Sequence, residues 1–474
     1  MASSNNKHML LRAVLAVTAT ILATAHARVH HLFVGNLYPP PRLYALVFDD
    51  ETLALEVTAN MTADSSHAWI AFDAGKTNVY GSSLDKPAIA SYEVVVNNSS
   101  SNTGNDGDDN YADDDEGAAT TVTNVTLEFR KSVAAAGACA NKTAAFVLPH
   151  PLFPRVYTAS WPGPDACAMA LSTNPDPTAP TNGSGGGMLE AVIQTWRYDS
   201  RTNSSGGIHG LALDPEGTAL YSADLEGDAV WAHIVSPDGT GRVVGLRGRY
   251  DLPEGRKGSH PRHLVVHPNG RVLYVVMEAA NVVAAYALDE VTRVPVAEIS
   301  WHSLVPVGAE PGEYWAAEVM LSASPSTAGE GGGSGAGGPK YLWATARAWT
   351  GNGTIEPHTG FISVFALDGV TGEILGEQRQ PLFRVPTTTL DGGANAISPA
   401  PWSEDWAAMT DIGTGYVQMW HIEKTTDENG EVTSTTARDV ARVDIPDGGV
   451  VLMLSGMTEV TWVGKTCHLY HIWE

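Results

Sequence analysis

The chain has 474 residues, of which 43% are hydrophobic and 17% charged, so it can bury a sizeable core and is not disordered as a whole. Acidic residues number 53 and basic residues 28, and the net charge of −25 argues against nucleic acid and anionic membrane surfaces as partners. Gly (48) and Pro (28) together make up about 16% of the chain, above the usual ~12%, which favours many turns over long helices.

Residues 1–27 have the organisation of a signal peptide. Lys7 and Arg12 supply positive charge, residues 15–23 are apolar or small apart from two threonines, and Ala25-His-Ala27 fits a small-x-small cleavage site. The apolar run is shorter than the ~20 residues that span a bilayer. We therefore expect cleavage near Ala27 rather than a membrane anchor, and no membrane contact afterwards.

Glycosylation sequons agree with export. Eight Asn-x-Ser/Thr sequences occur, none with Pro in the middle: Asn60, Asn97, Asn98, Asn124, Asn141, Asn182, Asn203 and Asn352. The chain is rich in Ser, Thr and Asn, so chance is the alternative for any single sequon. Together they predict a secreted, N-glycosylated protein.

Three cysteines are too few for a disulfide scaffold. Cys139 and Cys167 can pair in an oxidising compartment and leave Cys467 over, or all three can be free and buried. The sequence holds neither a CxxC pair nor an HExxH motif, so we predict no zinc site.

A 53-residue repeat organises the middle of the chain. Five residues recur 53 positions later: Leu211, Pro215, Gly217, Leu220 and Tyr221 match Leu264, Pro268, Gly270, Leu273 and Tyr274. A third copy places Asp73 and Tyr80 at a common offset of 141 from Asp214 and Tyr221, and degenerate copies cover 340–368 and 406–422.

Each copy reads as a short strand, a tight turn opened by Asp-Pro or His-Pro, and further strands, because Pro fixes φ and the following Gly accepts positive φ. Antiparallel strands repeating every 40–55 residues or so are the signature of β-propeller blades. A β-sandwich, which also has many short strands, is the alternative. We predict an all-β propeller that forms one domain over residues 28–474.

Two segments do not fit the repeat and are predicted to be disordered loops inserted into it. Residues 99–116 are too acidic and polar to fold, and residues 326–339 are nearly all Gly, Ser, Ala and Glu. A calcium site in the acidic loop is the alternative, although the spacing of a D-x-D-x-D-G loop is missing.

Ionisable residues at equivalent points of neighbouring blades are the candidate site. His209 and Arg262 stand 53 residues apart, each just before the equivalent strand, while Glu278 and Arg347 follow similar points of later strands. The inner strands of a propeller converge on a central channel, where ligands bind. Each residue taken alone can equally be a satisfied buried polar group. His267 matches Asp214 and is interpreted as a turn residue.

Several of these motifs resemble the lactonase-type seven-bladed β-propeller family, and within it the fungal carboxymuconate-lactonizing branch. The resemblance lies over about residues 30–446, in Ile208-His-Gly-Leu-Ala-Leu-Asp-Pro-x-Gly217, Leu220-Tyr-Ser-Ala-Asp-Leu225, His30-His-Leu-Phe-Val-Gly35, His260-Pro-Arg262, Met277-Glu-Ala279 and Asn395-Ala-Ile-Ser-Pro399. It implies seven blades and a cofactor-free cycloisomerase that closes 3-carboxy-cis,cis-muconate, or a similar small polycarboxylate, to a lactone.

The same resemblance implies four catalytic residues: His209, Arg262, Glu278 and Arg347. The arginines would clamp carboxylates of the small anionic substrate, and either Glu278 or His209 would supply the proton. The alternatives are a secreted lactone hydrolase of the 6-phosphogluconolactonase type and a non-catalytic ligand-binding propeller. Two features depart from the family, an intracellular one of aromatic catabolism: the apparent export, and the tail at 451–474, which leaves closure of the last blade open.

Overall fold

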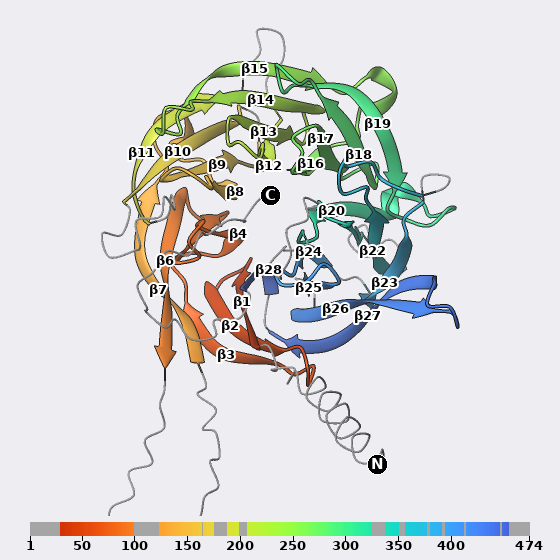
Figure 1. Cartoon of the computed structure of the whole chain (residues 1–474). Coiled ribbons are helices and arrows are strands. Elements are labelled where there is room, and N and C mark those ends of the chain that lie inside the picture. Colours follow the sequence, from red (N-terminus) through yellow and green to blue (C-terminus); the bar gives the residue numbers. More distant parts are fainter. Residues whose placement is uncertain are drawn as a thin grey trace, which may run out of the picture.

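The computed structural model describes residues 29–98, 123–163, 165–174, 187–198, 206–324, 337–349, 356–376, 380–390, 394–411, 414–445 and 448–454. They form seven four-stranded antiparallel sheets arranged as the blades of a ring (Figure 1). The prediction of an all-β, seven-bladed propeller is confirmed. The predicted signal peptide, the acidic loop 99–116 and residues 326–336 of the Gly-rich loop lie outside the described residues, and 337–339 are irregular.

The strands of each blade follow, from the innermost outward. Blade 1 holds β28 (Gly448–Leu454), β1 (Val29–Asn36), β2 (Arg42–Asp49) and β3 (Leu55–Thr62). Blade 2 holds β4 (His67–Phe72), β5 (Asn78–Ser83), β6 (Ala88–Asn98) and β7 (Thr123–Ala134). Blade 3 holds β8 (Ala144–Pro149), β9 (Arg155–Ser160), β10 (Cys167–Asn174) and β11 (Met188–Arg197). Blade 4 holds β12 (Ile208–Leu213), β13 (Ala219–Asp224), β14 (Ala229–Val235) and β15 (Val243–Asp251).

Blade 5 holds β16 (Pro261–Val266), β17 (Val272–Met277), β18 (Val282–Leu288) and β19 (Pro295–Ser303). Blade 6 holds β20 (Tyr314–Leu321), β21 (Tyr341–Ala348), β22 (Thr359–Ala366) and β23 (Phe383–Leu390). Blade 7 holds β24 (Ala394–Pro399), β25 (Trp406–Asp411), β26 (Tyr416–Thr426) and β27 (Val432–Asp444). Three short 3-10 turns complete the described elements: η1 (Gly137–Cys139), η2 (Glu254–Arg256) and η3 (Pro311–Glu313).

Blade 1 closes the ring by joining the two ends of the fold. β28 pairs antiparallel with β1, with Leu454 opposite His31 and Val451 opposite Val34. The innermost strands then contact one another all the way round, in the order β4, β8, β12, β16, β20, β24 and β28 (Figure 1). The question that the divergent tail left open is thereby answered, because residues 448–454 supply the missing strand.

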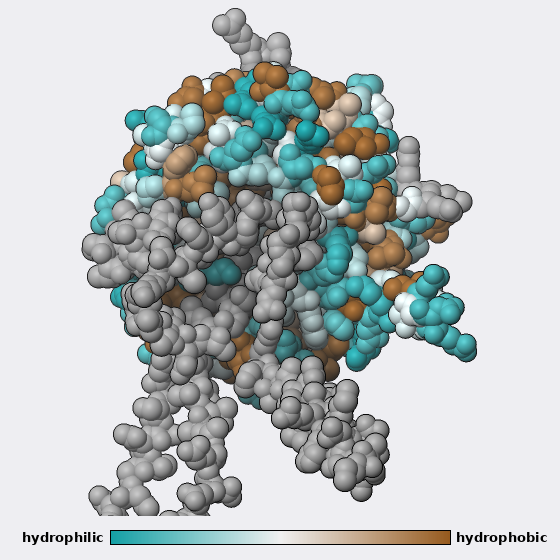
Figure 2. Space-filling model, in the orientation of Figure 1, coloured by the Kyte–Doolittle hydropathy of each residue, from teal (hydrophilic) through white to brown (hydrophobic). Residues whose placement is uncertain are grey.

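The blades pack through apolar faces on both sides of each sheet. Every residue of β17 is buried, as expected for a strand covered on both faces. Outermost strands are partly open, and β15 and β19 leave four large apolar side chains exposed: Val244, Leu246, Val296 and Ile299. Figure 2 shows hydrophobic residues interspersed with hydrophilic ones around the ring.

Tyrosines on the second strand tie each of blades 2–5 to the next blade. Each hydroxyl donates to a backbone carbonyl in or beside an outer hairpin of the following blade: Tyr80 to Gly187, Tyr157 to Gly241, Tyr221 to Arg293 and Tyr274 to Gly372. All four acceptor residues have positive φ. The Tyr that recurs in the sequence repeat therefore serves packing between blades.

The predicted turns are confirmed. Asp214 Oδ1 accepts hydrogen bonds from the backbone N–H groups four and five residues on, at 2.6 and 2.8 Å, and Asp73 does the same in blade 2. His267 Nδ1 accepts from the N–H of Asn269 at 3.2 Å, so this histidine is a turn residue, as predicted.

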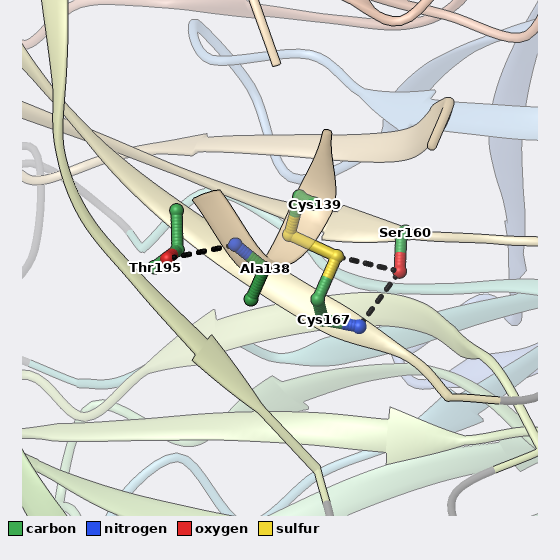
Figure 3. Close-up of a disulfide and its surroundings, with 5 residues drawn as sticks. All are labelled: Ala138, Cys139, Ser160, Cys167 and Thr195. Carbon is green, nitrogen blue, oxygen red and sulfur yellow. Dashed lines mark hydrogen bonds between the residues drawn. A yellow bond between two sulfur atoms is a disulfide. The ribbon is translucent and has the colours of Figure 1, made fainter. Parts of the chain in front are cut away.

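A disulfide joins Cys139 of η1 to Cys167 at the start of β10, with an S–S distance of 2.02 Å (Figure 3). Beside it, the N–H of Cys167 donates to Ser160 Oγ at 2.8 Å, and the N–H of Ala138 donates to Thr195 Oγ1 at 3.2 Å. The structure thus selects the paired alternative for these two cysteines, and Cys467 lies outside the described residues. Within the described ranges, no helix has the length and apolar character needed to cross a bilayer.

Candidate functional site

A β-bulge interrupts the innermost strand of six successive blades. In blades 2–7 the register between the first and second strands shifts at one point near the start of the first strand. The extra residue has no partner in the ladder of backbone hydrogen bonds between the two strands, and its side chain points in a different direction. At all six bulges a residue lines one central cavity: Ala68, Ala145, His209, Arg262, Glu318 and Ala396.

The cavity has a volume of about 570 Å³ and holds all four predicted site residues. His209 lies on β12, Arg262 on β16, Glu278 directly after β17, and Arg347 on β21. The expectation that these residues share one pocket is confirmed, while their chemical roles stay predictions. Aromatic side chains form much of the remaining wall: Tyr38, Trp69, Trp161 and Trp315.

One carboxylate oxygen holds both arginines. Arg347 Nη2 donates to Glu278 Oε2 at 3.0 Å, and Arg262 Nε lies 2.8 Å from the same oxygen, close enough for an ion pair although its N–H is not aligned for a hydrogen bond. Arg262 Nη1 also donates to the carbonyl of Ala317. Two cations sharing one anion leave a local excess of positive charge inside a strongly negative molecule. This cluster is suited to binding anions.

Stacking fixes the position of Arg347. Its guanidinium lies over the ring of Trp315, 5.1 Å from the ring centroid, and Trp315 stacks on Trp349 at 4.0 Å. Burial, and next the charge of Arg262, lowers the pKa of Arg347 to about 10. The group therefore stays charged at neutral pH.

His209 begins a line of hydrogen-bonded groups that continues through His263 and Glu318, which also line the cavity. His209 Nδ1 lies 3.0 Å from His263 Nε2, and His263 Nδ1 lies 2.8 Å from Glu318 Oε2. The three residues come from blades 4, 5 and 6 and expose only 8%, 4% and 2% of their surface. Both contacts therefore cross a boundary between blades, and Glu318 Oε1 also accepts from the N–H of Val319 at 3.1 Å.

Burial sets the charge state of this line. Desolvation, followed by the charges of Arg262 and Arg347, lowers the pKa of both histidines well below its usual value. Desolvation also raises the pKa of Glu318 to about 8, although Arg262 opposes the rise. Both directions favour the uncharged forms, a carboxylic acid beside two neutral imidazoles, over an ion pair.

A glycine brings the two imidazoles together. A Cβ placed on Gly210 would lie 2.6 Å from the carbonyl oxygen of Arg262 and 2.9 Å from His263 Cα. Only glycine allows β12 to approach β16 this closely. The residue after His209 therefore sets its distance from His263.

Sequence reasoning missed His263 and Glu318. A signal was present, because Glu318 is a lone acid in the apolar run of β20 and follows His263 by 55 residues, close to the repeat length. Among the residues that the structure describes, no group of three or more His, Cys, Asp or Glu side chains is arranged to hold a metal ion.

Comparisons with known proteins agree with this architecture. The family model described as "Lactonase, 7-bladed beta-propeller" matches residues 181–328, and the fold has the seven blades of that description. Over these residues the chain is similar to the lactonase family of seven-bladed β-propellers. The resemblance predicted from the sequence is thereby confirmed.

Two fungal relatives are named for related reactions. The chain is 29% identical over 426 residues to carboxy-cis,cis-muconate cyclase of Neurospora crassa, covering 89% of this chain and 97% of the relative. It is 28% identical over 238 residues to muconate cycloisomerase 1 of Cutaneotrichosporon cutaneum, covering 48% and 54%. The names of the relatives and of the family support an enzyme of lactone chemistry.

Solved structures support the fold. A 6-phosphogluconolactonase-like protein of Bacteroides fragilis has a TM-score of 0.61 at 14% identity and covers 91% of this chain and 99% of its own. The periplasmic gluconolactonase of Pseudomonas aeruginosa has a TM-score of 0.60 at 16% identity and covers 90% and 99%. At these identities the likeness concerns architecture alone.

Proposed function

We propose that the protein is a cofactor-free cycloisomerase that closes 3-carboxy-cis,cis-muconate, or a similar small polycarboxylate, to a muconolactone. The observation that carries the proposal is the arginine pair. Arg262 and Arg347 are both held by Glu278 Oε2 and line the same cavity as His209. A polycarboxylate needs several cationic contacts, and the ring closure needs a proton donor beside them.

The chemistry can be followed bond by bond. A carboxylate oxygen of the substrate attacks one carbon of a double bond, and a C–O bond forms. The other carbon of that double bond bears a second carboxylate. The electron pair of the double bond moves toward that second carboxylate and gives an enolate. A guanidinium facing the enolate stabilises its charge, since such groups act strongly in a site that excludes water. A proton then forms the new C–H bond.

The two candidate proton donors differ in their surroundings. Glu278 Oε2 is held between two guanidinium groups, so Glu278 positions the arginines. His209 uses Nδ1 for its bond to His263, which leaves Nε2 as the nitrogen able to meet a substrate. We therefore assign proton delivery to His209 and anchoring to Glu278.

Lactone hydrolysis is the second candidate, because the matching family is named for lactonases. The same arginines would bind the carboxylate of an acidic lactone, and His209 would activate water. A propeller that binds such anions without turning them over is the remaining alternative.

A spectroscopic assay separates these functions. Loss of the diene absorbance of 3-carboxy-cis,cis-muconate reports cyclisation, acid release from sugar lactones reports hydrolysis, and calorimetry with the same compounds reports binding alone. We expect cyclisation by the wild type and a loss of about 10²-fold or more in Arg262→Ala. Arg256→Ala is the matched control, because Arg256 of η2 pairs with Glu298 of β19 and does not line the cavity. Equal activity of wild type and Arg262→Ala on every substrate would refute a catalytic site here.

We further propose that the protein acts after export. The sequons at Asn60, Asn97 and Asn141 have exposed side chains, as glycan attachment requires. N-terminal sequencing of secreted material should begin near Arg28, and glycosidase treatment should lower its mass. An intact Met1 on the secreted protein would contradict the proposal.

A further inference from the structure

We propose that Glu318, His263 and His209 form a proton relay that delivers, through His209 Nε2, the proton consumed in ring closure. The inference rests on the proposed function and adds two residues to it. His209 is the group that meets the substrate. The other two residues act through His209: His263 passes the proton on, and Glu318 holds the proton beforehand.

The geometry is that of a continuous chain. His263 uses both ring nitrogens, Nε2 toward His209 at 3.0 Å and Nδ1 toward Glu318 Oε2 at 2.8 Å. Apolar rings shield it, since Trp69 and Phe146 lie edge-on to its imidazole at 5.0 and 5.4 Å between centroids. Buried polar groups linked in this way are costly unless each is satisfied, so the chain is a built feature of the hub.

His209 needs such a partner because it cannot hold an extra positive charge. Burial and the guanidinium groups of Arg262 and Arg347 disfavour its imidazolium form. A neutral imidazole that gives up its only N–H becomes an anion, which is far too unstable to form at neutral pH. Donation becomes feasible when Nδ1 receives a proton as Nε2 releases one.

The relay balances in three transfers. The Nε2–H bond of His209 breaks, its electron pair stays on nitrogen, and the proton joins the carbon of the enolate. His209 Nδ1 takes the proton from His263 Nε2, and His263 Nδ1 takes the proton from Glu318 Oε2. Both rings end neutral in the opposite tautomer, and Glu318 ends as a carboxylate. After the product leaves, a proton from solvent binds His209 Nε2, and the three transfers run in reverse. Both tautomers and the acid form of Glu318 are thereby restored before the next turnover.

The charged and titratable groups around the chain determine its response to pH. Arg262 acts on all three members and Arg347 on both histidines, while Glu278 and Tyr38 act on Arg347. Burial raises the pKa of Glu318 to about 8. Below that pH the relay is loaded and His209 is an acid, whereas above it His209 Nε2 carries a lone pair. Cyclisation should therefore decline as pH rises through about 8, and lactone hydrolysis should rise.

The kinetic test compares kcat, KM and their pH profiles in wild type, Glu318→Gln and His263→Gln. The amide introduced by Glu318→Gln can hold the same tautomers but has no proton to release. We expect kcat for cyclisation to fall about 10²-fold with KM nearly unchanged, and the alkaline decline to disappear. His233→Gln is the matched control, because His233 is also buried but does not line the cavity. Unchanged kcat and an unchanged alkaline limb in Glu318→Gln would overturn the relay.

A second measurement needs no turnover. Infrared spectra of the wild type should show the carbonyl band of a protonated carboxylic acid at pH 7 that fades through about pH 8, and nitrogen NMR should show His209 and His263 changing tautomer together. Absence of the band, or its persistence in Glu318→Gln, overturns the relay even in an active enzyme. Conversely, a wild type that acts on no carboxymuconate or lactone refutes the proposed function, while the band still decides whether the proton store exists.

Discussion

Two arcs of the same ring differ in the side chains at the β-bulges of their innermost strands. The residues that line the cavity at the bulges are His209, Arg262 and Glu318 in blades 4, 5 and 6 (the polar arc). In blades 2, 3 and 7 (the alanine arc) they are Ala68, Ala145 and Ala396. The backbone device is the same in both arcs. The polar arc therefore carries the candidate chemical groups, and the alanine arc carries small side chains at the equivalent backbone positions.

Histidines show the same contrast. His67, next to the bulge in blade 2, bonds within its own blade: it lies 2.9 Å from the carbonyl of Ser82 and 2.6 Å from the hydroxyl of Tyr92. His209 and His263 instead bond across blades. A histidine of the alanine arc thus stabilises a sheet, while those of the polar arc connect sheets at the cavity.

The largest expected effect comes from removing a guanidinium group from the polar arc. Arg347→Ala removes a carboxylate contact and should lower kcat/KM for cyclisation by about 10²–10³-fold, with Arg347→Lys between it and wild type. The fold should persist, because Glu278 keeps its pair with Arg262. Arg249→Ala is the matched control, since Arg249 also lies over a tryptophan, Trp231, but outside the cavity. Equal losses in the two variants would contradict the division into arcs.

The next effect concerns stability in acid. Burial lowers the pKa of His67 to about 4, so the folded state binds fewer protons than the unfolded state between about pH 4 and 6.5. Its contribution is present above pH 6.5 and is lost as pH falls, by up to about 3 kcal/mol. Urea unfolding at several pH values should show this slope in wild type and a shallower one in His67→Gln. An identical slope in both would show that His67 does not set the acid limit.

The smallest effect tests the space in the alanine arc. Ala68→Leu adds bulk to the cavity wall and should raise KM about tenfold, which corresponds to ~1.4 kcal/mol, with a smaller change in kcat. Steady-state kinetics on the same substrate measures it. Ala297→Leu on the exposed outer strand β19 should leave KM unchanged. A normal KM in Ala68→Leu would mean that the substrate does not use this side of the cavity.

Most of the fold was predictable because its signals are local. The Asp214 and His267 turns are satisfied within a few residues, so the repeat in the sequence marks them directly. The 53-residue offset also placed His209 and Arg262 at equivalent points, and both occupy bulges. What the repeat could not reveal is the bulge itself, which depends on the pairing of two strands.

The partners of the site residues were harder to predict, because they lie in other blades. His263 stands beside Arg262 in the sequence, yet its role depends on Glu318, which reaches it only when blades 5 and 6 pack together. The choice between Glu278 and His209 as proton donor was open for the same reason. It turns on two guanidinium groups meeting one oxygen, a contact among residues up to 85 positions apart in the chain.

Ring closure has a consequence for the order of synthesis. Of the strands that the structure describes, the ribosome makes β1 first and β28 last, yet the two are neighbours in one sheet. Until residue 448 has emerged, blade 1 lacks its innermost strand and β1 presents an unpaired edge, which other chains can pair with. A nascent chain interrupted before that point would keep every residue of the polar arc, but its ring of blades would not close.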